Sequence, residues 1–454
     1  MLLIIIAALF LRVIFLSPFL EDWDSVQFAL GMHHFSLSLH QPHPPGYPIY
    51  VFLGSFINLI LQNDNLSLSL LSAILGSFMA IPFYLILQKI TGKITAIFGT
   101  VVLLVIPIQW ALSEVSLSNI PGMFFNILTI SVVFLNPKRP KALYIASILA
   151  GFTLGVRFAE YSILICLLAF VLLRYRHSVK TIFVSLVLFF IGISIWLIPL
   201  IYITGLSEFL SLYIKQASYI KSHDSVVSIS MIERIAQIKY LFKIAFGKIF
   251  YIVPISTAIF SLLKFKSYAR NKEWQFGIVW FLSYFFPFLF VYNLEVPRHI
   301  FPLIPSLIFL FINSSEKLPR LISSLVLLTV ILAIFPMSLK QVTILHKEVP
   351  PSIQPVTFIK NNYDPKNTTL LTTFVFRQTQ YYASEFQNYY PDDSINAKIS
   401  SKNVILDYLP TKDRVPALKN YTLVKTEEFI GDREVYPRLN KVTLFILSSN
   451  SSKP

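Results

Sequence analysis

Long apolar segments alternate with short polar ones along the first 340 residues of the chain. A helix needs about 20 apolar residues to cross a membrane. The pattern predicts eleven such spans: 2–20, 66–88, 94–112, 120–135, 142–156, 160–173, 181–203, 244–263, 275–292, 299–313 and 321–339. Segment 48–61 is a further apolar run of 14 residues. It is too short for a span and is predicted to lie along the outer membrane surface.

The pattern changes at about residue 340. Four stretches rich in β-branched and aromatic residues follow, separated by polar turns: TTLLTTFVF, KNVILDYL, NYTLVKT and VTLFILS. Such stretches are typical of strands. Eleven of the 23 acidic residues also lie beyond this point. The sequence therefore predicts a transmembrane domain over 1–340 and a small α/β domain over 341–454.

Composition supports a membrane protein. The chain is 55% hydrophobic and only 13% charged, and its mean hydropathy is +0.66, whereas about a quarter of the residues of a soluble protein are charged. The net charge of +15 would suit nucleic acid, but the basic residues occur in short clusters between apolar runs. No nucleic-acid partner is therefore predicted. Cys166 is the only cysteine, which excludes a disulfide within one chain.

The basic clusters also predict the orientation, because cytoplasmic loops are enriched in Lys and Arg. Fourteen Lys and Arg residues fall in alternate loops, at 89–93, 136–141, 174–180, 264–274 and 314–320. The short loops on the other side contain only Arg157 and Arg298. The long loop at 203–248 has little weight in this rule. We expect an integral plasma-membrane protein with its N-terminus inside and the loop 21–65 and the C-terminal domain outside.

Residues 1–20 are too uniformly apolar for a secretory signal and lack a cleavage site, so they are predicted to remain as the first span. The predicted fold class is thus an all-α polytopic membrane protein of about 11 transmembrane helices. A small C-terminal extracytoplasmic α/β domain completes it.

The first external loop carries the densest set of reactive side chains. It contains three carboxylates and four histidines: Glu21, Asp22, Asp24, His33, His34, His40 and His43. Further polar residues lie at the outer ends of later spans: Glu114, Arg157, Glu160, Arg298 and His299. Each could be a structural ion pair or a side chain that reaches the headgroups. Their common side of the membrane favours a shared site.

These residue types suit sugar transfer from a phosphate carrier. A carboxylate can accept the proton of the acceptor hydroxyl. The departing phosphate is a weak base that needs positive charge, which the planar fork of Arg supplies well. Arg298 is predicted as the main phosphate ligand, and Arg157 as a second ligand or the ion-pair partner of Glu160.

At these residues the chain resembles the GT-C superfamily of membrane glycosyltransferases, in particular bacterial relatives of the transmembrane protein O-mannosyltransferases. In that family a first-loop acid is followed by an HPPGYP motif, here Asp24 and residues 43–48. A later W…EV motif corresponds to Trp110, Glu114 and Val115. Weaker likeness at 155–157 and 297–305 extends the resemblance over roughly residues 10–310.

The resemblance implies a GT-C-like catalytic domain and a polyprenyl-phosphate sugar donor, with mannose one candidate sugar. It also implies an inverting displacement toward an acceptor protein or glycolipid among membrane lipids. The family's catalytic acid falls on Asp24, with Asp22 and Glu114 as further candidates. The candidate substrate-binding residues are His40, His43, Tyr47, Arg157, Arg298 and His299. Many members have Gly-Glu after the first-loop Asp, where this chain has Val26 and Gln27.

Two other functional classes stay open at the level of sequence. A transporter or flippase of lipid-linked sugars would place ionisable residues near mid-membrane and show internal repeats. An O-antigen polymerase or ligase is the other alternative. Side chains able to bind a divalent metal occur at Asp22, Asp24, His40 and His43, but their spacing matches no metal signature. We therefore expect the histidines to hydrogen-bond within the loop and assign no metal ligand, with a divalent metal as the alternative.

Overall fold

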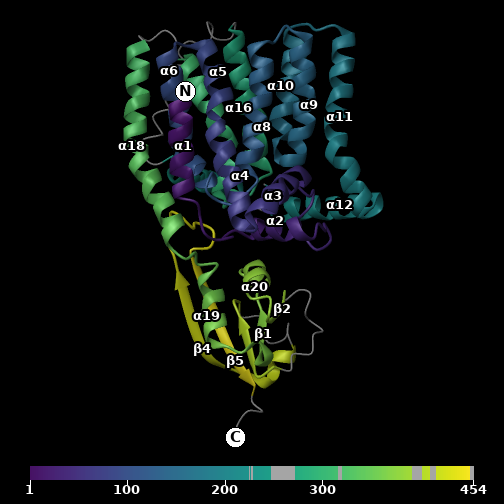
Figure 1. Cartoon of the computed structure of the whole chain (residues 1–454), viewed down its shortest axis with the longest axis vertical. Coiled ribbons are helices and arrows are strands. Elements are labelled where there is room, and N and C mark those ends of the chain that lie inside the picture. The colour runs from purple at the N-terminus through teal and green to yellow at the C-terminus, as the bar shows by residue number, and fades with distance from the viewer. Residues whose placement is uncertain are drawn as a thin grey trace.

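A computed structural model describes residues 1–223, 225, 229–246, 271–314, 320–390, 401–408 and 416–449. The protein has two parts, a broad layer of helices and a smaller sheet-containing part at one end of that layer (Figure 1).

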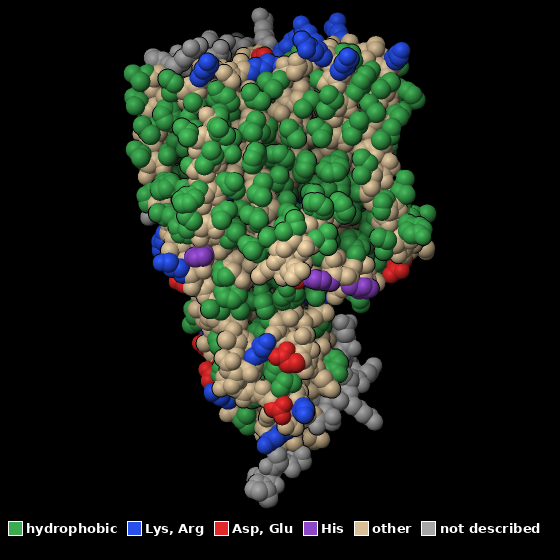
Figure 2. All heavy atoms as spheres, in the orientation of Figure 1, with side chains coloured by type: hydrophobic (Ala, Val, Ile, Leu, Met, Phe, Trp, Pro, Cys, Tyr) green, Lys and Arg blue, Asp and Glu red, His purple; other side chains and the backbone are tan. Residues whose placement is uncertain are grey.

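The helical layer is formed mainly by helices that run side by side (Figure 1). They are α1 (Leu2–Ile14), α4 (Asp64–Phe78), α5 (Ala80–Ile90), α6 (Lys93–Val105), α8 (Asn119–Leu135), α9 (Pro140–Val156), α10 (Tyr161–Arg174), α11 (Val179–Thr204), α16 (Lys272–Phe290), α17 (Ile304–Ser314) and α18 (Arg320–Lys347). Hydrophobic side chains cover most of the face of the layer that Figure 2 shows. A broad apolar surface suits lipid contact, as expected of an integral membrane protein.

Ten of the eleven predicted spans fall on these helices. The exception, 244–263, lies almost entirely outside the described residues. Three described segments are long and apolar enough to cross a membrane by length and composition: Asp64–Ile90, Val179–Thr204 and Leu321–Lys347. Several boundaries differ from prediction; α18, for example, continues to Lys347, eight residues beyond the predicted end. Helix α1 ends at Ile14, shortly before Pro18, and the span predicted at 94–112 breaks at Ile106 before α7 (Pro107–Leu112). A proline has no N–H to continue a helix and disfavours the helical conformation of the residue before it.

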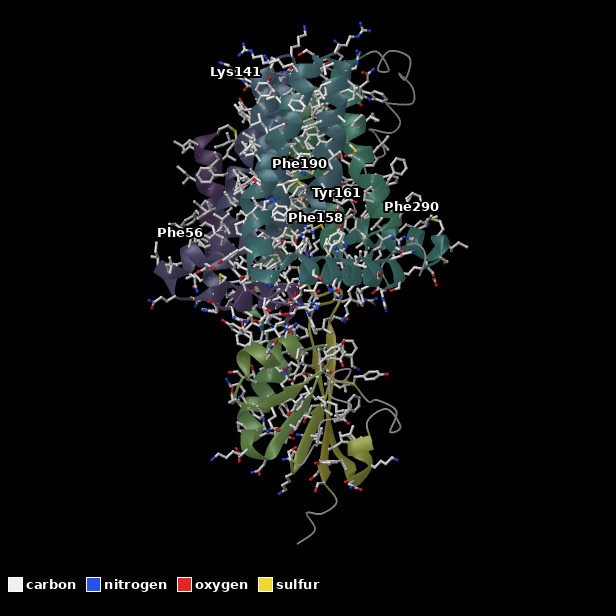
Figure 3. The ribbon with its side chains drawn as sticks, turned by 90° about the vertical axis from the view of Figure 1, so that its right-hand side faces the viewer. Phe56, Lys141, Phe158, Tyr161, Phe190 and Phe290 are labelled. Carbon is white, nitrogen blue, oxygen red and sulfur yellow. The ribbon has the colours of Figure 1, made fainter. Side chains whose placement is uncertain are left out.

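Further helices lie at or near the end of the layer that faces the sheet. They are α2 (Trp23–His33), α3 (Pro48–Leu61) and α12 (Leu206–His223) (Figure 1), with α13 (Met231–Phe246) and the short turns η1 (Phe158–Glu160) and η2 (Pro297–Leu303). Helix α3 buries Tyr50 but exposes Phe52 and Phe56, the latter on the outer edge of the molecule in Figure 3. The exposed apolar row agrees with the predicted contact of 48–61 with the membrane surface.

The C-terminal part is built on a five-stranded sheet of order β2-β1-β3-β5-β4. Its strands are β1 (Thr368–Leu371), β2 (Gln387–Tyr389), β3 (Asn403–Leu406), β4 (Tyr421–Ile430) and β5 (Lys441–Ser449). The first three are parallel, and β5 is antiparallel to both β3 and β4. Helices α19 (Gln354–Asn362) and α20 (Phe376–Tyr382) accompany it, with turns η3 (Pro365–Asn367) and η4 (Pro416–Asn420). The predicted fold class is confirmed.

The C-terminal part holds the start of the first loop through the backbone. The Leu20 N–H donates to the Tyr382 hydroxyl (2.9 Å). The carbonyl of Glu21 accepts from the Ser352 hydroxyl (2.8 Å) and from the Gln378 amide (3.0 Å). These contacts fix the position of the segment that leads into α2.

Candidate active site

A cavity of about 1050 Å³ lies between the helical layer and the C-terminal part. The start of α2, the loop before η2 and α7 contribute walls on the helical side. Helix α20 and the turn between β4 and β5 contribute the opposite wall. Predicted site residues that line this cavity are Asp22, Asp24, His40, His43 and Arg298.

Two aspartates open α2 and face this cavity. Asp22 is the N-cap residue, and its Oδ1 accepts the Asp24 N–H at 2.9 Å. Asp is among the preferred N-cap residues because its side chain satisfies an otherwise free N–H. Asp24 lies in the first turn, where the helix dipole stabilises negative charge. The local sequence thus positions two carboxylates two residues apart at the start of α2.

Arg298 joins both aspartates with the two arms of its guanidinium. Its Nη1 donates to Asp22 Oδ2 at 2.5 Å and its Nη2 to Asp24 Oδ2 at 2.6 Å. Arg298 is separated from Asp24 by 274 residues in sequence. Its side chain is only 11% exposed, so the pair is weakly screened by solvent. The predicted phosphate ligand and the predicted base are therefore in direct contact.

The surroundings keep Asp24 ionised. Burial alone would raise its pKa, but the charges of His43 and Arg298 outweigh burial and lower the pKa to about 2. Arg438 and Arg157 act in the same direction from farther away. While Arg298 stays bound to it, Asp24 is charged but has little affinity for a proton.

His43 connects α2 to the Pro-rich loop. Its Nδ1–H donates to Gln27 Oε1 at 2.6 Å, and its Nε2 lies 3.1 Å from the Tyr47 hydroxyl oxygen. Nδ1 also lies 3.7 Å from Asp24 Oδ1. Burial lowers the pKa of His43, while the charge of Asp24 opposes this shift. Gln27 thus orients His43.

The loop that carries His40, His43 and Tyr47 is tightly folded. Ser36 and Gln41 pair through their backbones at 2.7 and 2.8 Å. Gly46 has φ +110°, a conformation that residues with side chains rarely adopt, and a Cβ there would meet Leu37 at 3.0 Å. This explains the glycine in HPPGYP. The conformation presents the ring of Tyr47 to Phe28 of α2, edge to face, at 5.2 Å.

Four predicted site residues do not line the cavity: Glu114, Tyr47, Arg157 and His299. Glu114 is fully buried and accepts from the Trp110 indole at 2.5 Å, within electrostatic reach of Arg12. Arg157 donates to the Ser118 hydroxyl at 3.1 Å and lies 3.8 Å from Glu160, the ion pair that the sequence predicted as one alternative. His299 bonds to the backbone carbonyl of Asn293 at 2.7 Å.

Other residues at the cavity were missing from the predicted site: Glu21, Arg377, Gln378, Tyr436 and Arg438. Arg377 lies over the ring of Trp23 at 5.7 Å and donates to the carbonyl of Leu39 at 3.1 Å. Four of the five come from the C-terminal part and give no motif in sequence. Within the described ranges, no group of three or more His, Cys, Asp or Glu side chains is arranged to hold a metal ion.

One protein-family model and several solved structures match the chain. Residues 42–202 match the family model of dolichyl-phosphate-mannose-protein mannosyltransferase. ArnT from Cupriavidus metallidurans, solved bound to undecaprenyl phosphate, is similar with a TM-score of 0.60 at 12% sequence identity, over 98% of this chain and 97% of that chain. A search of curated proteins by sequence found no match.

A second similar structure is the Archaeoglobus fulgidus oligosaccharyltransferase tethered with an acceptor peptide containing the NVT sequon. Its TM-score is 0.52 at 13% identity, over 89% of this chain and 69% of that chain. The match to ArnT covers nearly the full length of both chains, so the helical layer and the C-terminal part share one overall arrangement with it.

Proposed function

We propose that the chain is a membrane glycosyltransferase of the GT-C superfamily, related to the protein mannosyltransferases; the family match over residues 42–202 and the fold similar to ArnT support this. It transfers a sugar from a polyprenyl-phosphate donor to an acceptor hydroxyl on the outer side of the membrane. The observation that carries the proposal is the Arg298 fork, which joins Asp22 and Asp24 at the wall of the large cavity. Undecaprenyl phosphate bound to ArnT supports the donor class.

In this proposal the donor phosphate and the aspartates compete for Arg298. A phosphate oxygen takes one arm of the guanidinium, which can bind phosphate and carboxylate equally well. Asp24 then loses one of the charges that lower its pKa, so its affinity for a proton rises when the donor is bound. Asp22 keeps the other arm and holds Arg298 at the site.

The reaction is a single displacement. The acceptor oxygen attacks the anomeric carbon and gives its proton to Asp24. The bond from that carbon to the phosphate oxygen breaks, and its electron pair stays on the phosphate. Arg298 stabilises the charge on the leaving polyprenyl phosphate. His43 lies beside Asp24 and is held by Gln27, so we assign it the role of positioning the carboxylate.

Substitution of Asp24 and Arg298 tests this reaction. Asp24→Asn keeps the shape but cannot accept the proton, so turnover should fall by at least about 100-fold while donor affinity changes far less. Arg298→Lys keeps the charge but loses the fork and should be impaired, and Arg298→Ala more so. The assay supplies undecaprenyl phosphate that carries a radiolabelled sugar, together with membranes as the source of acceptor. It measures the rate at which the label leaves the lipid.

Asp364→Asn and Arg139→Lys, both far from the cavity, are the matched controls and should behave as wild type. Near-normal turnover of Asp24→Asn would remove it as the base. If Arg298→Lys equals wild type in turnover and donor affinity, the phosphate is bound elsewhere.

A further inference from the structure

Three polar atoms at the cavity have no hydrogen-bond partner among the described residues. They are Glu21 Oε2, Gln378 Oε1 and the Tyr436 hydroxyl oxygen. All three are buried atoms, and all three residues line the cavity. Nearly all buried polar atoms in folded proteins are paired, because an unpaired one loses its bonds to water without replacement. A cluster of three beside a large cavity therefore indicates a missing ligand.

Glu21 is connected to each of the other two residues. The Gln378 amide nitrogen donates to the Glu21 backbone carbonyl at 3.0 Å, which places its unpaired oxygen nearby. Glu21 also lies within electrostatic reach of Tyr436. The ring of Tyr436 packs against Ala111 and Leu345, so apolar contacts hold the ring and leave its hydroxyl free.

We infer that Glu21, Gln378 and Tyr436 form a subsite that binds hydroxyl groups of a sugar ring. The inference rests on the proposed function, since the cavity must then receive a sugar. The three groups are separate from the Arg298 fork, which would bind the phosphate. The subsite takes the sugar of the donor or a sugar of the acceptor, and its chemistry is the same for both.

The donors and acceptors match hydroxyl groups. Burial and the neighbouring Asp22 charge raise the pKa of Glu21 to about 8, so this carboxyl is protonated at neutral pH and can donate. Gln378 Oε1 only accepts, and the Tyr436 hydroxyl does both. A sugar hydroxyl also donates and accepts. A set of neutral groups is a poor match for an anion or a cation, which would leave the charge uncompensated.

Tyr436→Phe is the sharpest test, because the lost hydroxyl has no partner in the protein and folding should be unaffected. The probes are undecaprenyl phosphate alone and undecaprenyl phosphate carrying mannose, glucose or galactose, in detergent micelles. If the subsite binds the donor sugar, the variant should bind the preferred sugar-bearing lipid about 3- to 10-fold more weakly and the bare lipid equally. If it binds an acceptor sugar, donor affinity stays constant and KM for native membrane acceptors rises by that factor.

Glu21→Leu should give the same loss, whereas Glu21→Gln, which still donates and accepts, should stay within about twofold of wild type at neutral pH. Tyr363→Phe, outside the cavity, is the matched control. The subsite is overturned if Tyr436→Phe and Glu21→Leu match wild type both in affinity for the sugar-bearing lipids and in KM for the membrane acceptors, while Arg298→Ala still loses affinity for undecaprenyl phosphate. A wild-type protein that binds no undecaprenyl phosphate would instead overturn the proposed function.

Discussion

Glu21 and Asp24 lie three residues apart, yet their surroundings shift their pKa values in opposite directions. Burial and Asp22 raise the pKa of Glu21 to about 8, whereas His43 and Arg298 overcome burial and lower that of Asp24 to about 2. Two carboxyls whose pKa values differ in this way can serve as one hydrogen-bond donor and one anion at the same pH. The geometry thus suits a neutral contact to the sugar beside a charged group at the reacting bond.

The raised pKa of Glu21 predicts how stability depends on pH. Between about pH 4.5 and pH 8 the folded protein keeps the proton that the unfolded chain loses, so this carboxyl makes folding less favourable as pH rises through that window. Glu21→Gln removes this dependence. The variant should therefore gain thermal stability over wild type at pH 8 and gain little at pH 5. Glu208→Gln, on the exposed face of α12, is the control, and an equal gain at both pH values would contradict the assignment.

Much of the candidate site could be predicted from sequence, because its signals are local. Asp22 and Asp24 follow the first apolar run, and the HPPGYP segment begins 19 residues after Asp24 in the same loop. Arg298 was found because basic residues on the outer side are rare. Glu114 was selected by its motif, and only the fold reveals its buried bond to Trp110. The roles of Gln378 and Tyr436 depend on a contact between the two parts of the molecule, which no local pattern encodes.

At the scale of helices and strands, apolar length predicted most boundaries well, because a span must satisfy its own backbone within lipid. The helices and strands that were predicted wrongly have physical explanations. The stretch 203–248 is too polar for a span and was treated as a loop, yet α12 and α13 form there. Strand β2 has only three residues and was missed, and the second half of TTLLTTFVF leads into α20 rather than continuing β1. Short strands depend on their partners more than on their own sequence.

Asp64, in the first turn of α4, hydrogen-bonds to three other helices. Its substitution therefore tests how much these contacts between helices stabilise the fold. Its carboxylate accepts from His33 of α2 at 2.8 Å, from Asn58 of α3 at 2.7 Å and from Tyr381 of α20 at 2.7 Å. Asp64→Ala leaves three donors without their acceptor and should lower the free energy of unfolding by about 1–3 kcal/mol. Denaturant unfolding in detergent micelles measures it. Glu208→Ala also removes one negative charge and should change little; an equal loss in both variants would mean that the effect is general electrostatics.

At the scale of the whole molecule, charge is distributed unevenly between the two ends of the helical layer. Lys and Arg side chains gather at the end away from the sheet, and histidines lie at the boundary with the C-terminal part (Figure 2). Lys141 is at that basic end (Figure 3). Basic residues concentrate on the cytoplasmic side of membrane proteins. This asymmetry supports our proposal that the cavity and the C-terminal part lie outside the cell.

Cysteine labelling tests that orientation. In a Cys166→Ser background, the exposed positions Leu39 and Lys366, changed singly to Cys, should react in intact cells with a maleimide that cannot cross the membrane. Lys141→Cys should react only after the membrane is opened. The reason is the positive-inside rule, which puts the loop 136–141 in the cytoplasm. Labelling of Lys141→Cys in intact cells, with Lys366→Cys protected, would reverse the topology. The cavity would then face the cytoplasm, and an extracytoplasmic acceptor could not reach Asp24.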